Sequence, residues 1–352
     1  MVISRGVMHD GLIHTPLLSF GMSGEVFHAP LLAAHSKFKL AKIVDRKSDR
    51  ARNRYPDVTV TRQVDDVFKD DAIELVVVNT PNETHHAFVK AALEAGKHVI
   101  VEKPLTVTAQ EADDLIALAA KNKKVLSVFQ NRRWDGGFLT LQNILAQGLV
   151  GRVAEFEVHY DRYRNYIEPN TWKEVAAPGT GILYNLGSHL IDQVLVLFGK
   201  PLQVDARIGA QRTGGVVDDF YDLRFQYRDF LAIIKSSYLV KEPGPQYILH
   251  GVDGSFVKFG IDPQEQALKD GKVPGDAGWG IEDQSLWGTL NITGGRKKIE
   301  TIAGDYLLFY ENIFLAIRNS HPLAVKAEDA REVIRIIEAC YESNKQHRAI
   351  EV

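Results

Sequence analysis

The stretch Ser19-Phe20-Gly21-Met22-Ser23-Gly24 decides the fold of this chain. It follows a short apolar run and opens a helical one, which is the setting of a dinucleotide-binding fingerprint whose first glycine has become serine. Gly21 would let the backbone approach a pyrophosphate, and Gly24 would permit close contact between helix and strand. The helix N-terminus would supply N–H groups and a positive dipole to the phosphates. The alternative is that both glycines merely shape a turn.

The segments around this motif alternate between short β-like runs and longer helical patterns, as parallel βαβ units do. Helical spacing marks Phe88–Ala95 and Ala109–Ala120, with Gly96 ending the first helix and Thr108 with Glu111 forming a capping box for the second. Pro16 is irregular, because proline in a central strand forfeits a ladder hydrogen bond. These patterns predict a Rossmann-like parallel sheet with strands at Leu17–Phe20, Lys39–Val44, Leu75–Asn79, His98–Val101 and Val125–Phe129.

After Trp134 the pattern changes to strands with few helices. A short helix, Gln142–Gln147, precedes stretches that alternate with period two, which predicts a large, open-faced and mostly antiparallel sheet. The strongest helix here is Leu183–Phe198, stopped by Gly199, and Asp262–Gly280 is predicted to be a loop. The predicted strands are Val153–Tyr160, Gln203–Ala210, Phe220–Gln226, Leu231–Ser237 and Tyr247–Gly251.

Length and composition predict the number of domains and limit the possible partners and metal sites. A chain of 352 residues exceeds what one hydrophobic core serves, so we expect a Rossmann domain over 1–132 and an α+β domain over 133–352, with the final helix, 327–344, packing back on the first. A net charge of −3 with interspersed signs predicts no nucleic-acid or membrane partner. The lone Cys340 excludes an intrachain disulfide, and no Cys/His cluster has metal-ligand spacing. The leader Met1–Gly11 lacks the apolar core of a signal peptide, so we expect a metal-free cytoplasmic protein.

Asp45 and Arg46 lie about 20 residues after the glycines, at the end of the second strand. An acid at this point accepts hydrogen bonds from the ribose 2′-hydroxyl of NAD, whereas an arginine accommodates the 2′-phosphate of NADP. Both residues are expected to contact the cofactor, and the sequence leaves NAD and NADP open.

Polar residues also follow the later strands of the predicted parallel sheet. Glu102-Lys103-Pro104 ends one strand, where open α/β sheets bind their ligands. Burial there would depress the pKa of Lys103 toward the range of a proton-shuttling amine, although the alternative is a surface lysine before a turn. With the first loop, the residues expected to line the cofactor are Ser19, Gly21, Met22, Ser23, Gly24, Asp45, Arg46, Asn79, Thr80, Pro81, Asn82, His85, Glu102, Lys103, Asn131 and Arg132.

The helix after Gly179-Thr180-Gly181 carries Asn185, His189 and Asp192 at i, i+4 and i+7, on one face. Apolar residues mark its other face, so the polar stripe could simply be the solvated side of a surface helix. The glycines before it permit close approach of a ligand or another backbone.

These elements together resemble the glucose–fructose oxidoreductase/inositol dehydrogenase/MocA (Gfo/Idh/MocA) family of NAD(P)-dependent oxidoreductases. Gly21–Pro30, Glu102–Pro104, Gln130–Asp135 and Asn185–Asp192 carry the resemblance over nearly the full length. Within the family, the chain is most similar to NADP-dependent scyllo-inositol dehydrogenases, with which it shares the stretch Asp161–Arg164. The resemblance implies a homodimer or homotetramer, a cis peptide before Pro104, and hydride transfer between nicotinamide and a cyclitol or sugar carbon.

The resemblance also implies roles for individual residues. Lys103 would exchange a proton with the reacting oxygen, and His189 would bind or relay that proton. Family members that oxidise sugars commonly carry aspartate where this chain has Asn185, and an amide takes up no proton. A small polyhydroxylated substrate would be bound by Arg162, Tyr163, Trp172, Tyr184, Asn185 and Asp192.

Three functions remain open on the sequence. The first is an NAD(P)-dependent dehydrogenase or reductase of a polyhydroxylated ring or an aldose. The second, motivated by Ser19 and Asn185, is a sensor or regulatory protein that binds the cofactor with weak or no turnover. The third is reduction of a non-sugar carbonyl or double bond on the same scaffold.

Overall fold

The first domain is a Rossmann fold. The structure, a computed structural model, describes residues 11–352, so the expectation for the leader Met1–Gly11 lies outside it except for Gly11. Six parallel strands follow the order β3-β2-β1-β4-β5-β6, in which the strand order reverses beside β1. The strands are β1 (Ile13–Leu17), β2 (Phe38–Val44), β3 (Thr59–Thr61), β4 (Leu75–Val78), β5 (His98–Val101) and β6 (Leu126–Val128).

The first strand lies earlier than predicted. β1 ends at Leu17, so the expected strand Leu17–Phe20 was wrong, and Ser19 and Phe20 belong to the loop that follows. Pro16 is accommodated because the register between β1 and β2 shifts between Thr15 and Pro16, an irregularity of the β-bulge kind. A proline can therefore stand in a central strand of this sheet.

Helices cover this sheet, and α5 begins where predicted, whereas the helix predicted over Phe88–Ala95 begins three residues earlier, at His85. Thr108 and Glu111 form the expected capping box at the start of α5, and Gly96 has the positive φ that follows a helix end. The glycine-rich loop leads into a π-helical turn, η1, which continues into α1. The helical elements are η1 (Ser23–His28), α1 (Ala29–Ala34), α2 (Arg50–Arg54), α3 (Asp65–Phe68), η2 (Asn82–Thr84), α4 (His85–Glu94) and α5 (Ala109–Asn122).

The second domain is built on a nine-stranded sheet of order β14-β13-β12-β11-β7-β10-β9-β8-β15. Every pair is antiparallel except β7 with β10, which confirms the mostly antiparallel sheet. The prediction missed β3 and the last four strands. The strands are β7 (Val153–His159), β8 (Gln203–Gly209), β9 (Phe220–Gln226), β10 (Leu231–Ser237), β11 (Tyr247–Gly251), β12 (Gly254–Lys258), β13 (Gly288–Ile292), β14 (Gly295–Ile299) and β15 (Ile350–Glu351).

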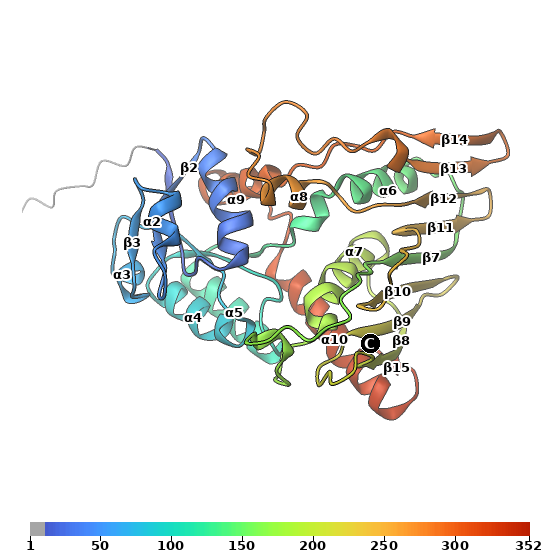
Figure 1. Ribbon diagram of the computed structural model, residues 1–352, viewed down its shortest axis with the longest axis horizontal. Helices are drawn as coiled ribbons and strands as arrows, with labels where there is room; N and C mark the ends of the chain where they lie inside the picture. Colours follow the sequence, from blue (N-terminus) through green and yellow to red (C-terminus); the bar gives the residue numbers. More distant parts are fainter. Residues whose placement is uncertain (1–10) are drawn as a thin grey trace, which may run out of the picture.

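Helices lie on one side of this sheet, between it and the Rossmann domain (Figure 1). The predicted helix Leu183–Phe198 is a π-helical turn, η5 (Leu183–Gly187), followed by α7 (Ser188–Phe198). The expected loop Asp262–Gly280 contains the short helix α8 (Gln264–Lys269). The other helical elements are η3 (Asn131–Trp134), α6 (Gly136–Ala146), η4 (Trp172–Glu174), η6 (Gln284–Leu286), α9 (Leu307–Asn319) and α10 (Ala327–Gln346).

Helix α10 joins the two halves. Ala330 and Ile334 belong to the apolar core around the parallel sheet, whereas Val333 and Ile337 belong to the core of the second sheet. The carboxylate of Glu338 also accepts a hydrogen bond from the first N–H of α5, at 2.9 Å. No helix within residues 11–352 is long and apolar enough to cross a membrane.

Candidate active site

The loop after β1 is held by a side chain from β4. Ser19 N donates to Asn79 Oδ1 at 3.0 Å, and Asn79 Nδ2 donates back to Ser19 O at 2.8 Å. A Cβ at Gly24 would lie 2.4 Å from Ser19 O, so glycine is required there for the helix to approach the loop. The backbone at Ser19 does not take a positive φ, so serine fits in place of the usual first glycine. Asn79 therefore shapes this loop rather than projecting into it.

The space above this loop fits a phosphate group. A Cβ at Gly21 would meet only the Ser19 hydroxyl, at 3.5 Å, and Met22 is half exposed. The first N–H groups of a helix have no partner within it, and here they belong to the turn that opens with Met22 and Ser23. The loop geometry thus suits a dinucleotide pyrophosphate.

Asp45 faces its own loop rather than outward. Its carboxylate accepts hydrogen bonds from the Ser48 N–H and hydroxyl, at 3.0 and 2.8 Å, and from Ala51 N at 3.3 Å. Burial would raise the pKa of Asp45, but the bonds from Ser48 and Ala51 outweigh it and hold the pKa below its usual value. Arg46 is exposed, with its guanidinium 5.5 Å from the centroid of the Phe88 ring.

Lys103 reaches from the end of β5 to the first turn of the η5–α7 helix. Its Nζ donates to the backbone oxygen of Asn185 at 2.7 Å and to Asn185 Oδ1 at 3.0 Å. Burial, together with the positive charges of Lys173, Arg132 and Arg162, lowers the pKa of Lys103 to about 8 against the opposing effect of Glu102. The alternative of a surface lysine is wrong, and the peptide before Pro104 is cis.

His189 and Asp192 are buried, so the interpretation of their helix face as solvated was wrong. Burial and the charges of Lys103 and Arg132 hold the pKa of His189 well below its usual value, and its Nδ1 is buried without a partner. Asp192 points elsewhere: Arg133 donates to both of its oxygens, at 2.8 and 2.6 Å. The expectation that Asp192 binds substrate is corrected, because this ion pair occupies its carboxylate.

Two buried histidines support the strand ends behind Lys103. His28 bridges Tyr310 and Glu102, with Nδ1 2.7 Å from the Tyr310 hydroxyl and Nε2 3.1 Å from Glu102 Oε1. The other oxygen of Glu102 accepts from Lys103 N at 3.1 Å. His85 is fully buried between the carbonyls of Pro104 and Thr80, at 2.8 and 2.9 Å, so its predicted contact with the cofactor is corrected to a supporting role.

Arg132 lies in the short turn η3 that follows β6, and its charge acts on the pKa of both Lys103 and His189. Its guanidinium is held by Asp135 and Glu265, at 3.3 and 2.6 Å, but its buried Nε has no partner. The ring of Tyr160 lies between two cations, with the Arg132 Cζ 4.7 Å and the Arg162 Cζ 5.2 Å from its centroid. The positive charges of Arg132 and Arg162 both lower the pKa of Lys103.

Other predicted cofactor residues lie in the loops at the strand ends. Asn82 Nδ2 donates to Gly179 O at 2.7 Å, and the hydroxyls of Thr80 and Thr84 lie 2.6 Å apart. Pro81 caps the short helix η2, and Asn131 is buried at the start of η3. Asn82 therefore joins the loop after β4 to the second domain.

Two predicted substrate contacts have other neighbours in the structure. Tyr184 donates its hydroxyl to Val107 O at 2.9 Å and stacks on Tyr341, while Tyr163 is half exposed against Lys241. The expectation for Tyr184 is corrected, because its hydroxyl is bound to Val107 O, whereas substrate binding by Tyr163 stays a prediction. Trp172 is partly exposed beside Lys173.

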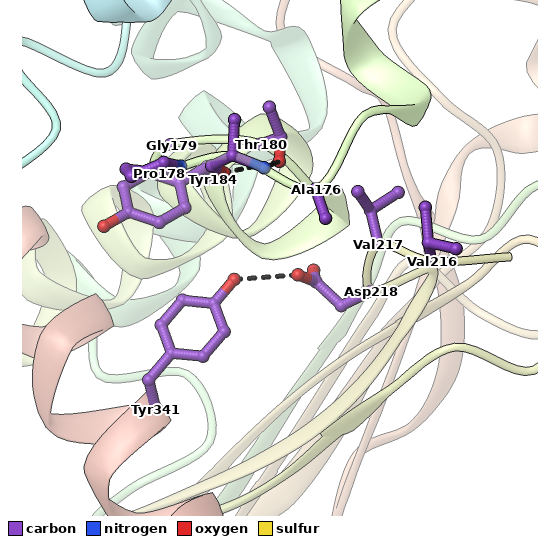
Figure 2. Close-up of a pocket in the computed structure, with 10 residues that line it drawn as sticks. Ala176, Pro178, Gly179, Thr180, Tyr184, Val216, Val217, Asp218 and Tyr341 are labelled. Carbon is purple, nitrogen blue, oxygen red and sulfur yellow. Dashed lines mark hydrogen bonds between the residues drawn. The ribbon is translucent and has the colours of Figure 1, made fainter.

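A cavity of about 340 Å³ opens beside Tyr184 and Tyr341 (Figure 2). Asp218 projects toward it and accepts a hydrogen bond from the Tyr341 hydroxyl at 2.8 Å. Burial raises the pKa of Asp218. Neither Lys103 nor His189 lines this cavity, so the volume is separate from the lysine centre.

The sequence did not predict three residues that contact or influence the site around Lys103. Lys173 acts on the pKa of Lys103, but it lies in a stretch without periodic pattern. His28 stands beside the glycine-rich loop in sequence, within the stretch that carries the family resemblance, and this was the available signal. Tyr160 ends the alternating strand that was predicted over Val153–Tyr160.

Comparisons with known proteins agree with this architecture. Residues 18–130 match the family model for the NAD-binding Rossmann fold of the oxidoreductase family, and residues 143–352 match the model for its C-terminal alpha/beta domain. The two halves thus define an oxidoreductase with an NAD-binding Rossmann fold. The chain belongs to the Gfo/Idh/MocA family.

Individual relatives span the whole chain. A scyllo-inositol 2-dehydrogenase (NADP(+)), IolW, from Bacillus subtilis is 41% identical over 99% of this chain and 99% of its own length. An uncharacterized oxidoreductase of Escherichia coli, YdgJ, is 40% identical over 96% and 97%. The solved structure of a Bacillus subtilis oxidoreductase described as putative, yvaA, superposes with a TM-score of 0.93 at 39% identity, covering 97% of this chain and 98% of that one.

Proposed function

We propose that this protein is an NADP-dependent oxidoreductase that interconverts a secondary alcohol and a carbonyl on a small polyhydroxylated compound, a cyclitol or a sugar. The observation that carries the proposal is Lys103 in contact with Asn185, one helical turn from His189, at the ligand-binding edge of the parallel sheet. The similarity to an enzyme named as a scyllo-inositol 2-dehydrogenase supports the alcohol chemistry.

Lys103 has the properties that a proton-transferring residue needs. With a pKa of about 8, its amine is partly neutral near physiological pH and can accept the hydroxyl proton. The bound nicotinamide would accept or donate the hydride. Asn185 holds the amine through neutral oxygens, so it orients Lys103 without fixing it in the charged state.

His189 would act as a neutral hydrogen-bonding partner of the substrate. Its pKa is too far lowered for an imidazolium at neutral pH, so it offers either a ring N–H or a lone pair. The unpartnered Nδ1 supports a role toward a ligand, because a buried polar atom without a partner is costly. His189 would thus position the reacting hydroxyl beside the Lys103 amine.

The NADP form is favoured by the loop after β2. The Asp45 carboxylate accepts hydrogen bonds from Ser48 and Ala51, which hold it against its own loop rather than toward a ribose. Arg46 and Lys47 are exposed next to it, and guanidinium and ammonium groups suit a 2′-phosphate. The name of the Bacillus subtilis relative, which specifies NADP(+), agrees with this choice.

The test is turnover by the full chain with NADP or NAD and a panel of cyclitols and aldoses, followed by nicotinamide absorbance. We expect activity with NADP that falls at least about a hundredfold in Lys103→Met, the range that general acid–base catalysis contributes. Wild-type activity in that variant would contradict the assignment of Lys103 as the proton-transferring residue. Tight NADPH binding without turnover of any compound would favour the regulatory alternative that Asn185 raised.

A further inference from the structure

The carboxylate of Glu102 lies beside Lys103 without forming an ion pair with it. Glu102 Oε2 accepts a hydrogen bond from the backbone N–H of Lys103 at 3.1 Å, whereas the Lys103 Nζ extends to two oxygens of Asn185. Among residues 11–352, no carboxylate lies within ion-pair distance of the Lys103 Nζ. A negative charge is thus held next to the lysine and kept out of contact with its amine.

The other oxygen of Glu102 is bound by a histidine from a distant part of the chain. His28 is the last residue of the π-helical turn η1, and its Nε2 lies 3.1 Å from Glu102 Oε1. Because an ionised carboxylate only accepts hydrogen bonds, Nε2 carries the proton of this bond. Both oxygens of Glu102 therefore have an N–H donor, as an ionised carboxylate needs when it is largely shielded from water.

Tyr310 fixes this histidine from its other side. The Tyr310 hydroxyl, on α9, lies 2.7 Å from His28 Nδ1, and both side chains are fully buried. The ring of Phe129 packs against the imidazole, with the two centroids 4.3 Å apart. Nδ1 accepts the hydroxyl proton in the neutral ring or donates to the hydroxyl oxygen in the charged ring, so the contact is satisfied in either form. The imidazole therefore has a fixed position and a fixed partner at each nitrogen.

His28 decides the charge of Glu102. Burial would raise the pKa of this carboxyl group, but the hydrogen bond and charge of His28, followed by the charges of Lys103 and His85, hold the pKa below its usual value. The Tyr310 phenol keeps its proton, because burial and the charge of Glu102 raise its pKa. Glu102 is therefore a carboxylate at neutral pH, and it depends on protein donors for that state.

The amine of Lys103 depends on this negative charge. Burial and three positive charges lower the pKa of Lys103, and the carboxylate of Glu102 opposes them. The positive charges are those of Lys173, Arg132 and Arg162. Without the carboxylate, a larger fraction of the amine would be neutral at physiological pH, and less of it could give a proton in the reduction.

We infer that His28 is a positioning residue of the reaction: held by Tyr310, it keeps Glu102 as a fixed negative charge beside Lys103, so that the amine can both accept and return a proton. The inference rests on the proposed function, in which Lys103 exchanges a proton with the reacting oxygen. In the oxidation, the substrate carbon loses a hydride to NADP and its hydroxyl loses a proton to the amine, and in the reduction both transfers run in reverse. Glu102 takes up no proton in either direction and acts through its charge.

Glu102→Gln tests the charge directly, because the amide has the same shape and can still accept the backbone N–H of Lys103. We expect the pKa of Lys103 to fall by about one unit, the lower end of the effect of a nearby opposite charge. The full chain is labelled with carbon-13 at the lysine ε position and titrated by NMR, with the Lys103 signal assigned by its loss in Lys103→Met. Glu94→Gln, which removes an exposed carboxylate at the end of α4, is the matched control. An unchanged pKa of Lys103 in Glu102→Gln overturns the inference.

Variants of His28 separate positioning from packing. His28→Phe keeps an aromatic ring but removes the donor to Glu102, so burial should leave that carboxyl group protonated and the pKa of Lys103 should fall as in Glu102→Gln. His28→Gln offers an N–H donor again and should recover at least about half of the shift. The double variant His28→Phe/Glu102→Gln should shift no further than Glu102→Gln, because both changes remove the same charge. A wild-type pKa of Lys103 in folded His28→Phe overturns the inference, and if that variant does not fold, a full shift in both His28→Gln and Glu102→Gln overturns it as well.

The pH profile of turnover separates this inference from the proposed function. In Glu102→Gln and His28→Phe, the midpoint of kcat against pH should move down by about one unit for oxidation and for reduction, whereas a loss of packing lowers kcat without moving the midpoint. A lowered NMR pKa of Lys103 together with wild-type turnover in Lys103→Met would support the role of His28 toward the lysine, and only the proposed function would fail. Turnover that depends on Lys103, with an unmoved midpoint and an unmoved pKa in both variants, leaves the function standing and overturns the inference.

Discussion

Replacing Asn185 by aspartate should raise the pKa of the catalytic lysine and move the pH profile of the enzyme. The Lys103 Nζ lies 3.0 Å from Asn185 Oδ1, so the new carboxylate would stand in direct contact with the ammonium group. An opposite charge at this distance favours the charged form and shifts a pKa by about 1 to 3 units. From its present value of about 8, the pKa of Lys103 would rise by that amount.

The sign of the pH dependence follows from which form of the amine reacts. Oxidation needs a neutral amine to accept the hydroxyl proton, so its rate should increase as the pH rises through about 8 in the wild type. Reduction needs the ammonium group as donor, so its rate should decrease over the same interval. In Asn185→Asp both transitions should move upward. At neutral pH, oxidation should slow by about tenfold or more, because each unit of pKa removes about nine-tenths of the remaining neutral amine.

The measurement is kcat against pH in both directions for one active substrate. Asn143→Asp is a matched control, since it adds the same charge on the exposed face of α6 and should leave the profile unmoved. If Asn185→Asp keeps the wild-type profile while remaining folded, Lys103 is not the group whose titration limits the rate. A shift of the same size in the control would show that the effect comes from net charge alone.

Three further changes test how the fold supports the site. Gly24→Ala puts a Cβ 2.4 Å from Ser19 O, so we expect NADPH binding, followed by fluorescence, to weaken at least about tenfold; unchanged affinity would show that the loop can shift without cost. Arg133→Met leaves the buried carboxylate of Asp192 without its partner and should lower the free energy of unfolding in urea by about 3 to 5 kcal/mol, whereas a loss under 1 kcal/mol would contradict the pairing. Tyr184→Phe removes one hydrogen bond to Val107 O and should cost about 1 kcal/mol in the same assay, with no effect on kcat if Tyr184 lies outside the site as described.

The sequence predicted the Rossmann half well because its signals are local. The capping box at Thr108, the glycine at 96 and the apolar β4 and β5 each depend on a few neighbouring residues. The second sheet was predicted only in part. β14 is polar on both faces, since an edge strand has little to bury, and so it showed no alternation to find.

The site was harder to predict because its contacts are long-range. Lys103 and His189 were found through motifs, but the partner of Asp192 is Arg133, 59 positions away, and no local pattern indicates that pair. Tyr184 stands next to Asn185 in sequence and yet turns to Val107 and Tyr341. Which side chain enters a cleft depends on the π-helical turn at the start of that helix, and its presence follows from packing rather than from spacing.

The charge around Lys103 explains why a neutral residue can stand at position 185. A carboxylate there would raise the pKa of the lysine, whereas Asn185 leaves burial and the cations Arg132, Arg162 and Lys173 to lower it to about 8. An amide at position 185 therefore keeps the amine partly neutral near physiological pH, and the neutral amine is the form that accepts the hydroxyl proton in the oxidation.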